Sequence, residues 1–388
     1  MQQTRHEVFF DTAERMDQVP DGSVHLIVTS PPYPMIAMWD ELFSRSDVAV
    51  AAALQRGEGN AAFEMMHRRL DPVWAEVHRV LVPGGFACIN IGDATRTVGG
   101  DFALYPSHMR IQKALTEVGL MALPGIIWRK QTNAPNKFMG SGVLPAGAYV
   151  TLEHEYILIF RKGPKREFVT DPDKQRRRES ALFWEERNAW FSDVWFDVKG
   201  SRQLLGEKDV RKRSGAFPFD IAQRLIAMYS VKGDRVLDPF LGTATTTAAA
   251  MAAGRNSIGY EIDSGLAQTI AQTVGRAAAL SASVHRQRLD SHVAFLAERI
   301  RENHCPKHRN VPYGFPVVMA QETSLIFNDA VQVERTGSGQ WRVDYAQAPQ
   351  AAYCRDWEAW LASEDRSGAL SESLCFCSPR PRQRGLFP

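Results

Sequence analysis

The sequence predicts an α/β protein with a mostly parallel central sheet. Short apolar runs alternate with stretches in which apolar residues recur every three or four positions, the spacing of a helix with one buried face. The run Val24 to Thr29 continues directly into Ser30-Pro31-Pro32-Tyr33. Two prolines must end a strand, because neither can donate to its ladder. In such a sheet, ligands bind beyond the carboxyl ends of the strands.

The first half of the chain contains a strand–helix–strand unit, a building block of parallel sheets. Apolar residues from Asp71 to Leu81 have helical spacing, Pro83-Gly84-Gly85 ends this helix, and Phe86 to Ile91 is the next strand. Ala122 to Lys130 and Tyr156 to Arg161 are expected to be strands on either side of a loop rich in Gly, Pro and Asn.

The second half continues the alternation up to about residue 280. Its predicted elements, in order, are the helix Phe219–Tyr229, the strand Arg235–Asp238, the small-residue helix Thr245–Ala253, the strand Ser257–Glu261 and the long helix Ser264–Leu280. Residues 239–244, like residues 30–33, follow the carboxyl end of a predicted strand, so the two loops can share one cleft. After about residue 285 the periodicity weakens, and the Pro- and Arg-rich residues 378–388 are expected to be disordered.

Composition indicates a globular protein without membrane spans. Of the 388 residues, 44% are hydrophobic and 23% charged, and no apolar run approaches the length of a membrane helix. Without a signal-peptide pattern, we expect a cytoplasmic protein. The five cysteines are odd in number and scattered, which argues against a disulfide framework. The spacing of Cys305, His308, Cys375 and Cys377 does not fit the usual zinc knuckles, so no metal site is expected.

One segment combines basic and aromatic residues, although the net charge of the chain is only +2. Between Arg161 and Arg213 there are 15 Lys and Arg against 10 Asp and Glu. Basic side chains among aromatics suit phosphate contact and base stacking, but they also suit a solvated face above a small aromatic cluster, which the segment alone favours. Trp128 and Trp195 are expected to be packing residues. The residues concerned are Lys174, Arg176, Arg177 and Arg178, followed by Phe183, Trp184, Trp190, Phe191 and Trp195.

The loop after Asp238 has features of a nucleoside site. Gly242 lies in a tight strand-to-helix turn, where backbone N–H groups can approach a ligand closely. Glu261, 23 positions after Asp238, ends the next strand and can accept hydrogen bonds from ribose hydroxyls. The loop lacks the GxGxxG and GK[ST] patterns, which favours a nucleoside ligand without phosphates over a nucleotide. An ordinary tight turn is the alternative interpretation.

The loop after Thr29 offers two hydrogen-bond acceptors and an aromatic face. An exocyclic base amine is a weak nucleophile, and acceptors that draw on its protons let the nitrogen become tetrahedral. The Ser30 hydroxyl and the Pro31 carbonyl can supply these acceptors, the prolines stiffen the loop, and Tyr33 offers a ring to an extrahelical base. A rigid turn with a solvent-facing serine is the alternative.

Together the two loops resemble the amino-directed DNA methyltransferases. That family's catalytic motif reads (D/N/S)PP(Y/F) and its cofactor motif resembles DPFxGxGTT, against SPPY and DPFLGTATT here. The catalytic motif comes first, which is similar to the permuted arrangement called the β class. The match covers roughly residues 5–280. Its other segments, in order, are Val8–Asp11, His78–Gly85, Ile126–Lys130, His154–Gly163, Ser192–Val198 and Ser214–Pro218.

The resemblance implies a Rossmann-like, S-adenosylmethionine-dependent methyltransferase fold in circularly permuted order, with an inserted recognition region and a C-terminal extension. Ser30, Pro31, Pro32 and Tyr33 would be catalytic. A flipped cytosine would attack the methyl group directly, without a covalent enzyme intermediate. The implied cofactor residues are Asp11 at the adenine, Glu261 at the ribose, Phe217 and Pro218 near the methionine end, and Asp238, Phe240, Gly242, Thr243 and Thr245 in the loop.

Two positions depart from the family pattern, and a third, position 30, bears on the choice of target base. Ala244 stands where the family has its second loop glycine, and Ser214 where it usually has histidine. Ser at position 30 goes mostly with N4-cytosine, whereas Asp goes mainly with N6-adenine. N6-adenine, an RNA base amine, a protein glutamine amide and a non-catalytic DNA-binding module are the alternatives. A zinc-protease motif at His154-Glu155 is excluded, because its second histidine would fall on Leu158.

The resemblance also predicts domains and partners. Residues 1–163 would form the catalytic half, 164–213 a candidate target-recognition region, 214–284 the cofactor half and 285–388 an extension that is a second candidate for DNA contact. Double-stranded DNA is the expected substrate and a cognate restriction endonuclease a candidate partner. No membrane is expected, and both a monomer and a homodimer are open.

Overall fold

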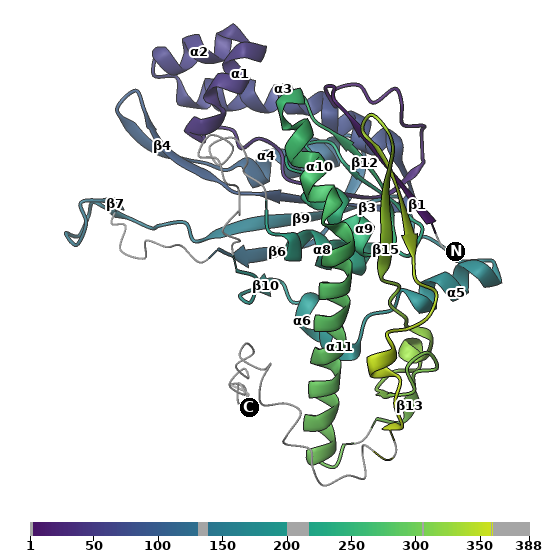
Figure 1. Cartoon of the computed structure of the whole chain (residues 1–388). Helices are drawn as coiled ribbons and strands as arrows, with labels where there is room; N and C mark the ends of the chain where they lie inside the picture. The colour runs from purple at the N-terminus through teal and green to yellow at the C-terminus, as the bar shows by residue number, and fades with distance from the viewer. Residues whose placement is uncertain (1–2, 131–138, 200–216, 305, 358, 360–388) are drawn as a thin grey trace.

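A ten-stranded sheet runs through the computed structural model, which describes residues 3–130, 139–199, 217–304, 306–357 and 359 (Figure 1). The strand order is β10-β6-β9-β3-β2-β11-β12-β1-β16-β15. Its five central strands, β3 to β1, are mutually parallel, which confirms the predicted fold class. Their bounds are β3 Leu81–Ile91, β2 Val24–Thr29, β11 Arg235–Asp238, β12 Asn256–Tyr260 and β1 Gln3–Phe9.

Antiparallel strands flank this parallel centre on both sides. On one side β9 (His154–Lys162) pairs with β3 and with β6 (Leu120–Arg129), and the short β10 (Val194–Trp195) closes that edge. On the other side the hairpin β15 (Ala330–Gly337) and β16 (Gln340–Tyr345) pairs with β1. The C-terminal extension therefore contributes two strands to the sheet.

Helices cover both faces of the central strands, so these strands are apolar on both sides. In β2, Ile27 packs in one core with side chains of α3 and α4, whereas Leu26 and Val28 pack in a second core with α8 and α9. These four helices are α3 (Gly59–Val80), α4 (Ser107–Glu117), α8 (Phe219–Tyr229) and α9 (Thr245–Ala252).

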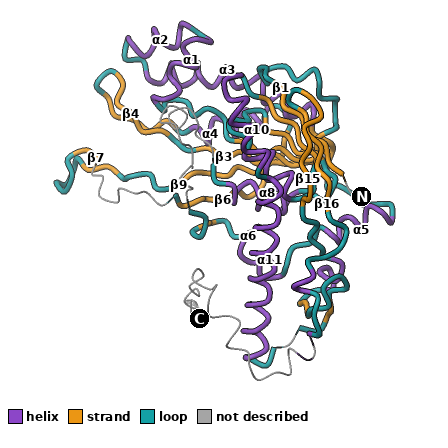
Figure 2. Tube along the Cα trace, viewed as in Figure 1, coloured by secondary structure: helices purple, strands orange, loops and turns teal. Residues whose placement is uncertain are grey.

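Smaller elements complete the described chain, and Figure 2 shows the long helix α11 running past the sheet and away from it. The remaining elements are α1 (Asp40–Ser46), α2 (Val48–Gln55), β4 (Ala94–Val98), β5 (Asp101–Tyr105), β7 (Met139–Gly140), β8 (Ala148–Tyr149), α5 (Asp171–Glu179), α6 (Trp184–Trp190), α10 (Ala267–Gly275), α11 (Ala277–Arg301), β13 (His308–Arg309), β14 (Pro316–Val317) and short 3-10 helices at Ala37–Trp39, Ser264–Leu266, Ala320–Ser324 and Ala351–Tyr353.

The predicted helix at Asp71 to Leu81 is confirmed but is the second half of a longer helix. Helix α3 begins at Gly59, twelve residues before the predicted start at Asp71, and contains Pro72 in its interior. It ends at Val80, and Pro83-Gly84-Gly85 lies in β3 at a register irregularity instead of a helix end. Gly84 has a φ of 81° there, a conformation that glycine adopts without strain.

The predicted helix at Ser264 to Leu280 is three elements, and the last of them, α11, reaches Arg301. The buried face of α11 carries polar residues at helical spacing. Ser281 donates to the Ala252 carbonyl, His285 pairs with Asp329, and His292 pairs with Glu185. Because these side chains are buried through hydrogen bonds, the hydrophobic periodicity that marks most helices is weak here.

A separate hydrophobic core joins residue 183 to the C-terminal extension. Phe183 stacks on His292 with ring centroids 3.9 Å apart and packs with α11 and residues 313–327. Trp190 and Trp195 are buried as well. The interpretation of Phe183 and Trp190 as base-stacking residues is wrong, because both are buried, and the predicted packing role of Trp128 and Trp195 is confirmed. Residues 200–213 of the candidate recognition region lie outside the described residues.

Two of the five cysteines lie in the described residues. Cys88 is a buried thiol and Cys354 an exposed one, whereas Cys305, Cys375 and Cys377 lie outside the described residues. The described side chains contain no cluster of three or more His, Cys, Asp and Glu residues that could hold a metal ion. None of the helices in the described ranges has the length and hydropathy to span a membrane.

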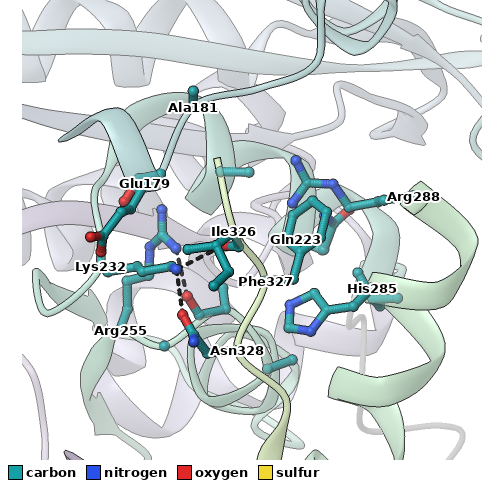
Figure 3. A pocket seen from close by; sticks show the side chains of 16 residues that line it. Glu179, Ala181, Gln223, Lys232, Arg255, His285, Arg288, Ile326, Phe327 and Asn328 are labelled. Atoms are coloured by element: carbon teal, nitrogen blue, oxygen red, sulfur yellow. Dashed lines mark hydrogen bonds between the residues drawn. The ribbon is translucent and has the colours of Figure 1, made fainter. Parts of the chain in front are cut away.

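Lys232 is buried in the loop that leads into β11, at the edge of the sheet away from the two predicted site loops. Figure 3 shows its ammonium group donating to the Ile326 carbonyl (2.7 Å) and to Asn328 Oδ1 (2.5 Å). Burial, assisted by the nearby Arg255 guanidinium, lowers the pKa of Lys232 from 10.5 to about 7.

This pKa predicts a pH dependence of stability. Between about pH 7 and pH 10 the unfolded chain binds a proton at Lys232 that the folded chain has released, so the free energy of unfolding rises with pH in that window. From pH 7 to pH 9 the rise attributable to this group is at most about 2 kcal/mol. Lys232→Met should remove it, as measured by urea denaturation at both pH values. An equal rise in both proteins would contradict this assignment.

Candidate active site

The loops at residues 30–33 and 239–244 lie side by side because they follow β2 and β11, which are neighbouring parallel strands. A buried carboxylate connects them. Thr29 Oγ1 donates to Asp238 Oδ1 (2.5 Å), and Thr246 Oγ1 donates to Asp238 Oδ2 (2.7 Å). The backbone N–H of Phe240 also donates to Oδ1, at 3.0 Å. Asp238 thus joins the end of the catalytic strand to the start of α9.

Asp238 is 2% exposed, and both its oxygens are engaged by protein donors. Burial raises the pKa of Asp238 to about 6, while the hydrogen bonds from Thr29, Thr246 and Phe240 act in the opposite direction. The buried Asp238 side chain therefore fixes the positions of the two loops through its hydrogen bonds.

Gly242 and Glu261 form the centre of the predicted cofactor site. Gly242 has a φ of 55°, and a Cβ atom there would meet no heavy atom within 4 Å, so space is open above its backbone. Its N–H donates to Glu261 Oε2 (2.8 Å), and the Asp263 N–H donates to Oε1 (2.9 Å). Glu261 is half-buried, and this burial raises its pKa.

This donor set fits a nucleoside with a cationic group better than a phosphate. Residues 239–244 and 261–263 contain no Lys or Arg, whereas Glu261 presents carboxylate lone pairs beside open space at Gly242. Thr243 is buried and Thr245 half-buried at the start of α9. The half-buried Phe240 ring packs edge-on to Trp74, with centroids 5.9 Å apart.

The other predicted cofactor residues lie at the same edge of the sheet. Asp11 follows β1, is exposed, and caps the Thr12 N–H at 2.7 Å. β1 and β12 are parallel neighbours, and the Glu261 N–H donates to the Phe9 carbonyl (3.0 Å), so Asp11 and Glu261 follow adjacent strand ends. Phe217 and Pro218 are buried directly before α8, the helix that returns the chain to the amino end of β11.

Ala244, where the resembled family has glycine, adopts a left-handed conformation. Its φ is 66° and its ψ 32°, and the residue is fully buried in a core with Leu241 and Met251. A non-glycine residue pays about 1–2 kcal/mol for this conformation. The methyl group gains about 0.8 kcal/mol from burial, which offsets part of that strain.

The loop Ser30-Pro31-Pro32-Tyr33, called the SPPY loop below, is held by a hydrogen-bonded network. Ser30 Oγ donates to Tyr33 Oη (3.1 Å), which donates to Glu155 Oε2 (2.9 Å). Asn90 Nδ2 donates to Tyr33 Oη (2.9 Å) and to Glu155 Oε2 (2.7 Å). Lys130 Nζ forms an ion pair with Glu155 Oε1 at 2.6 Å. The hydroxyls of Ser30 and Tyr33 are thereby placed in a single chain that ends on a carboxylate.

Burial keeps the Tyr33 hydroxyl protonated. Burial raises the pKa of Tyr33 well above 10, and the neighbouring Glu155 charge raises it further. Gly92 leaves room for this arrangement, because a Cβ atom there would lie 3.1 Å from Tyr33 Cε2 and 3.3 Å from Glu155 Cγ. Pro31 is buried and Pro32 half-buried. Within the described part of the chain, no donor contacts the Pro31 carbonyl oxygen.

Sequence reasoning missed Asn90, Lys130 and Glu155 as members of the site. Glu155 is 8% exposed and precedes a run of buried apolar residues in β9. A charged residue at such a position is a signal, because carboxylates are seldom buried without a partner. The sequence around Glu155 matches a strand segment of the resembled family and part of a protease motif, neither of which gives Glu155 a role, and its partner Tyr33 is 122 positions away.

Comparison with known proteins identifies the family. Residues 24–272 match the N6/N4 methyltransferase family model, which is described as DNA methylase. The chain belongs to this DNA methylase family. It is 49% identical over 323 residues to the Type II methyltransferase M.MthZI of Methanothermobacter thermautotrophicus, covering 83% of this chain and 90% of the relative.

Two further comparisons agree with this assignment. M.MjaI of Methanocaldococcus jannaschii, also a Type II methyltransferase, is 48% identical over 283 residues, covering 70% of this chain and 92% of the relative. Among solved structures, TTHA0409 of Thermus thermophilus, assigned as a DNA modification methylase and complexed with S-adenosyl-L-methionine, is similar with a TM-score of 0.55 and 31% identity. That match covers 70% of this methylase and 94% of TTHA0409.

Removing the Asp238 carboxylate should loosen both loops of the methylase. In Asp238→Ala, Thr29 and Phe240 lose their buried acceptor, while Thr246 retains the Val28 carbonyl at 3.2 Å. We expect a loss of about 2–4 kcal/mol in the free energy of unfolding, measured by urea denaturation. Asp238→Asn keeps one oxygen and should lose less than half as much. Equal losses in the two variants would show that the hydrogen bonds to Thr29 and Phe240 are unimportant.

Substitutions at Ala244 should separate backbone strain from packing. Ala244→Gly relieves the left-handed strain but loses a buried methyl group, so we expect a stability change below about 1 kcal/mol. Ala244→Val adds branched volume at a positive φ in a filled core and should cost at least about 2 kcal/mol. Thermal denaturation measures both variants, and a valine variant as stable as the wild type would contradict the described backbone.

Proposed function

We propose that the methylase transfers a methyl group from S-adenosyl-L-methionine to the N4 amine of cytosine in double-stranded DNA. The observation that carries this proposal is the orientation of Ser30, whose hydroxyl proton is directed to Tyr33 at 3.1 Å. The Ser30 oxygen then keeps its lone pairs for the protons of an incoming amine. Serine at this position of the motif supports cytosine over adenine.

The cofactor assignment is supported by the residues of the Gly242 turn. Glu261 would accept hydrogen bonds from the ribose hydroxyls, and the open backbone at Gly242 would contact the nucleoside. Asp11 would lie at the adenine, and Phe217 and Pro218 near the methionine end. S-adenosyl-L-methionine supplies an electrophilic methyl group when it is bound. The similar T. thermophilus protein in complex with this molecule supports the same assignment.

The residues of the SPPY loop would activate the amine by hydrogen bonding. The Ser30 oxygen and the Pro31 carbonyl accept its two N–H groups, which frees the nitrogen lone pair from conjugation with the ring. Tyr33 presents its ring to the extrahelical base. Attack by the nitrogen would be direct; of the thiols in the described part of the chain, Cys88 lies inside β3 and Cys354 in the C-terminal extension.

DNA would approach the carboxyl edge of the sheet, from which two hairpins project (Figure 1). The β4–β5 hairpin follows β3, and the β7–β8 hairpin follows β6 in the chain. Phe102 of β5 stacks on Tyr149 of β8 with centroids 4.5 Å apart. We assign target recognition to these hairpins in place of the aromatics of 164–199, of which Phe183, Trp190 and Trp195 are buried. The Type II names of the relatives support a restriction endonuclease as partner.

Ser30 should be needed for turnover and not for cofactor binding. Ser30→Ala removes one acceptor, and we expect kcat on DNA to fall on the order of 100-fold or more while the Kd for S-adenosyl-L-methionine changes less than about twofold. Ser23→Ala, directly before the same strand, is the matched control and should retain full activity. Equal loss of turnover and cofactor affinity in Ser30→Ala would mean that the loop has another role.

The substrate class is tested by offering DNA, RNA and protein side by side with labelled cofactor. Label in DNA alone supports the proposal, and label in RNA or in a glutamine amide supports one of the alternatives. Binding of the DNA without binding of the cofactor would support a non-catalytic module.

A further inference from the structure

We propose that Glu155 sets the direction of the hydrogen bonds in the SPPY loop, so that the Ser30 oxygen faces the substrate as a pure acceptor. Glu155 is a positioning residue in this account, acting through Tyr33. The inference rests on the proposed function, in which Ser30 accepts an amine proton.

The number of available protons dictates the direction. A carboxylate can only accept, so the Asn90 nitrogen must face Glu155 Oε2, and from there it also donates to Tyr33 Oη. The Tyr33 hydroxyl has one proton and gives it to the carboxylate at 2.9 Å. Its oxygen must therefore accept from Ser30, whose only proton is used in this way.

Lys130 preserves this polarity. Its ammonium group lies 2.6 Å from Glu155 Oε1, and the Glu155 side chain is 10% exposed. Lys130 therefore occupies Oε1, while Tyr33 and Asn90 donate to Oε2, so both oxygens of Glu155 face donors.

A glutamine at position 155 cannot satisfy all its neighbours. If its amide oxygen faces Tyr33 and Asn90, its NH₂ group meets the Lys130 ammonium. If the oxygen faces Lys130, the NH₂ group meets Tyr33 and Asn90, and the chain reverses. Glu155→Gln should therefore lower kcat without weakening cofactor binding, while Lys130→Met added to it should restore activity by freeing the first orientation.

The test is a double-mutant cycle in kcat with Tyr33→Phe, which keeps the ring and removes the link. We expect Glu155→Gln to lower kcat on the order of 100-fold in the wild-type background, but less than about threefold in the Tyr33→Phe background. Multiplicative losses would overturn the proposal, and so would a Glu155→Gln/Lys130→Met variant that is no more active than Glu155→Gln.

Two controls separate this proposal from folding effects and from the proposed function. Glu153→Gln, which affects the half-exposed pair with Arg129, should leave kcat unchanged. Thermal denaturation and the Kd for S-adenosyl-L-methionine report on folding. The activities of Glu155→Gln and Glu155→Gln/Lys130→Met are compared per folded molecule. The cycle is measured on whichever base amine the wild type methylates, so an adenine product would overturn the N4 assignment and leave this inference intact.

Discussion

The hydrogen bonds of Asp238 are the constraint on which the site depends. One carboxylate connects the last residue of β2, through Thr29, to the start of α9, through Thr246. Adjacent strands are about 4.8 Å apart, so the loops that follow them are forced to be neighbours. A buried carboxylate with three donors is costly to leave unpaired, which makes the relative position of the two loops a property of the fold.

Chain order matters less than strand order in this sheet. The SPPY loop precedes the cofactor loop by about 200 residues, yet β2 and β11 are neighbours, and β12 and β1 continue the parallel set. A residue that we assign to the site lies at the carboxyl end of each of these strands or within two residues after it. The antiparallel pairs at the two sides then extend the sheet, and the β15–β16 hairpin covers β1, which would otherwise be an exposed edge.

Much of the fold was predictable because strands that are buried on both faces have short, nearly continuous apolar runs in the sequence. Val24–Thr29 and Arg235–Asp238 were predicted with their observed bounds, as was the helix Phe219–Tyr229. Helix α11 was predicted only at its start, because Ser281 and His292 are polar residues on its buried face. Local patterns indicate hydrophobicity and cannot show that a distant partner will satisfy a buried polar group.

The same limit applies to the site. Ser30 and Gly242 could be predicted because their chemistry lies within a short motif, and a family resemblance supports both. Glu155 and Asn90 could not, because their importance arises from Tyr33, which the sheet brings to them from another strand. The motif gives the residue types, and the hydrogen-bonded network gives the direction in which the Ser30 and Tyr33 hydroxyls donate.

The most direct test of the central claim is the identity of the methylated nucleoside. Purified methylase is incubated with unmethylated DNA and S-adenosyl-L-methionine, and the DNA is digested to nucleosides and separated by mass spectrometry. The proposed function predicts N4-methylcytosine. N6-methyladenine would contradict it, showing that serine at position 30 does not select cytosine.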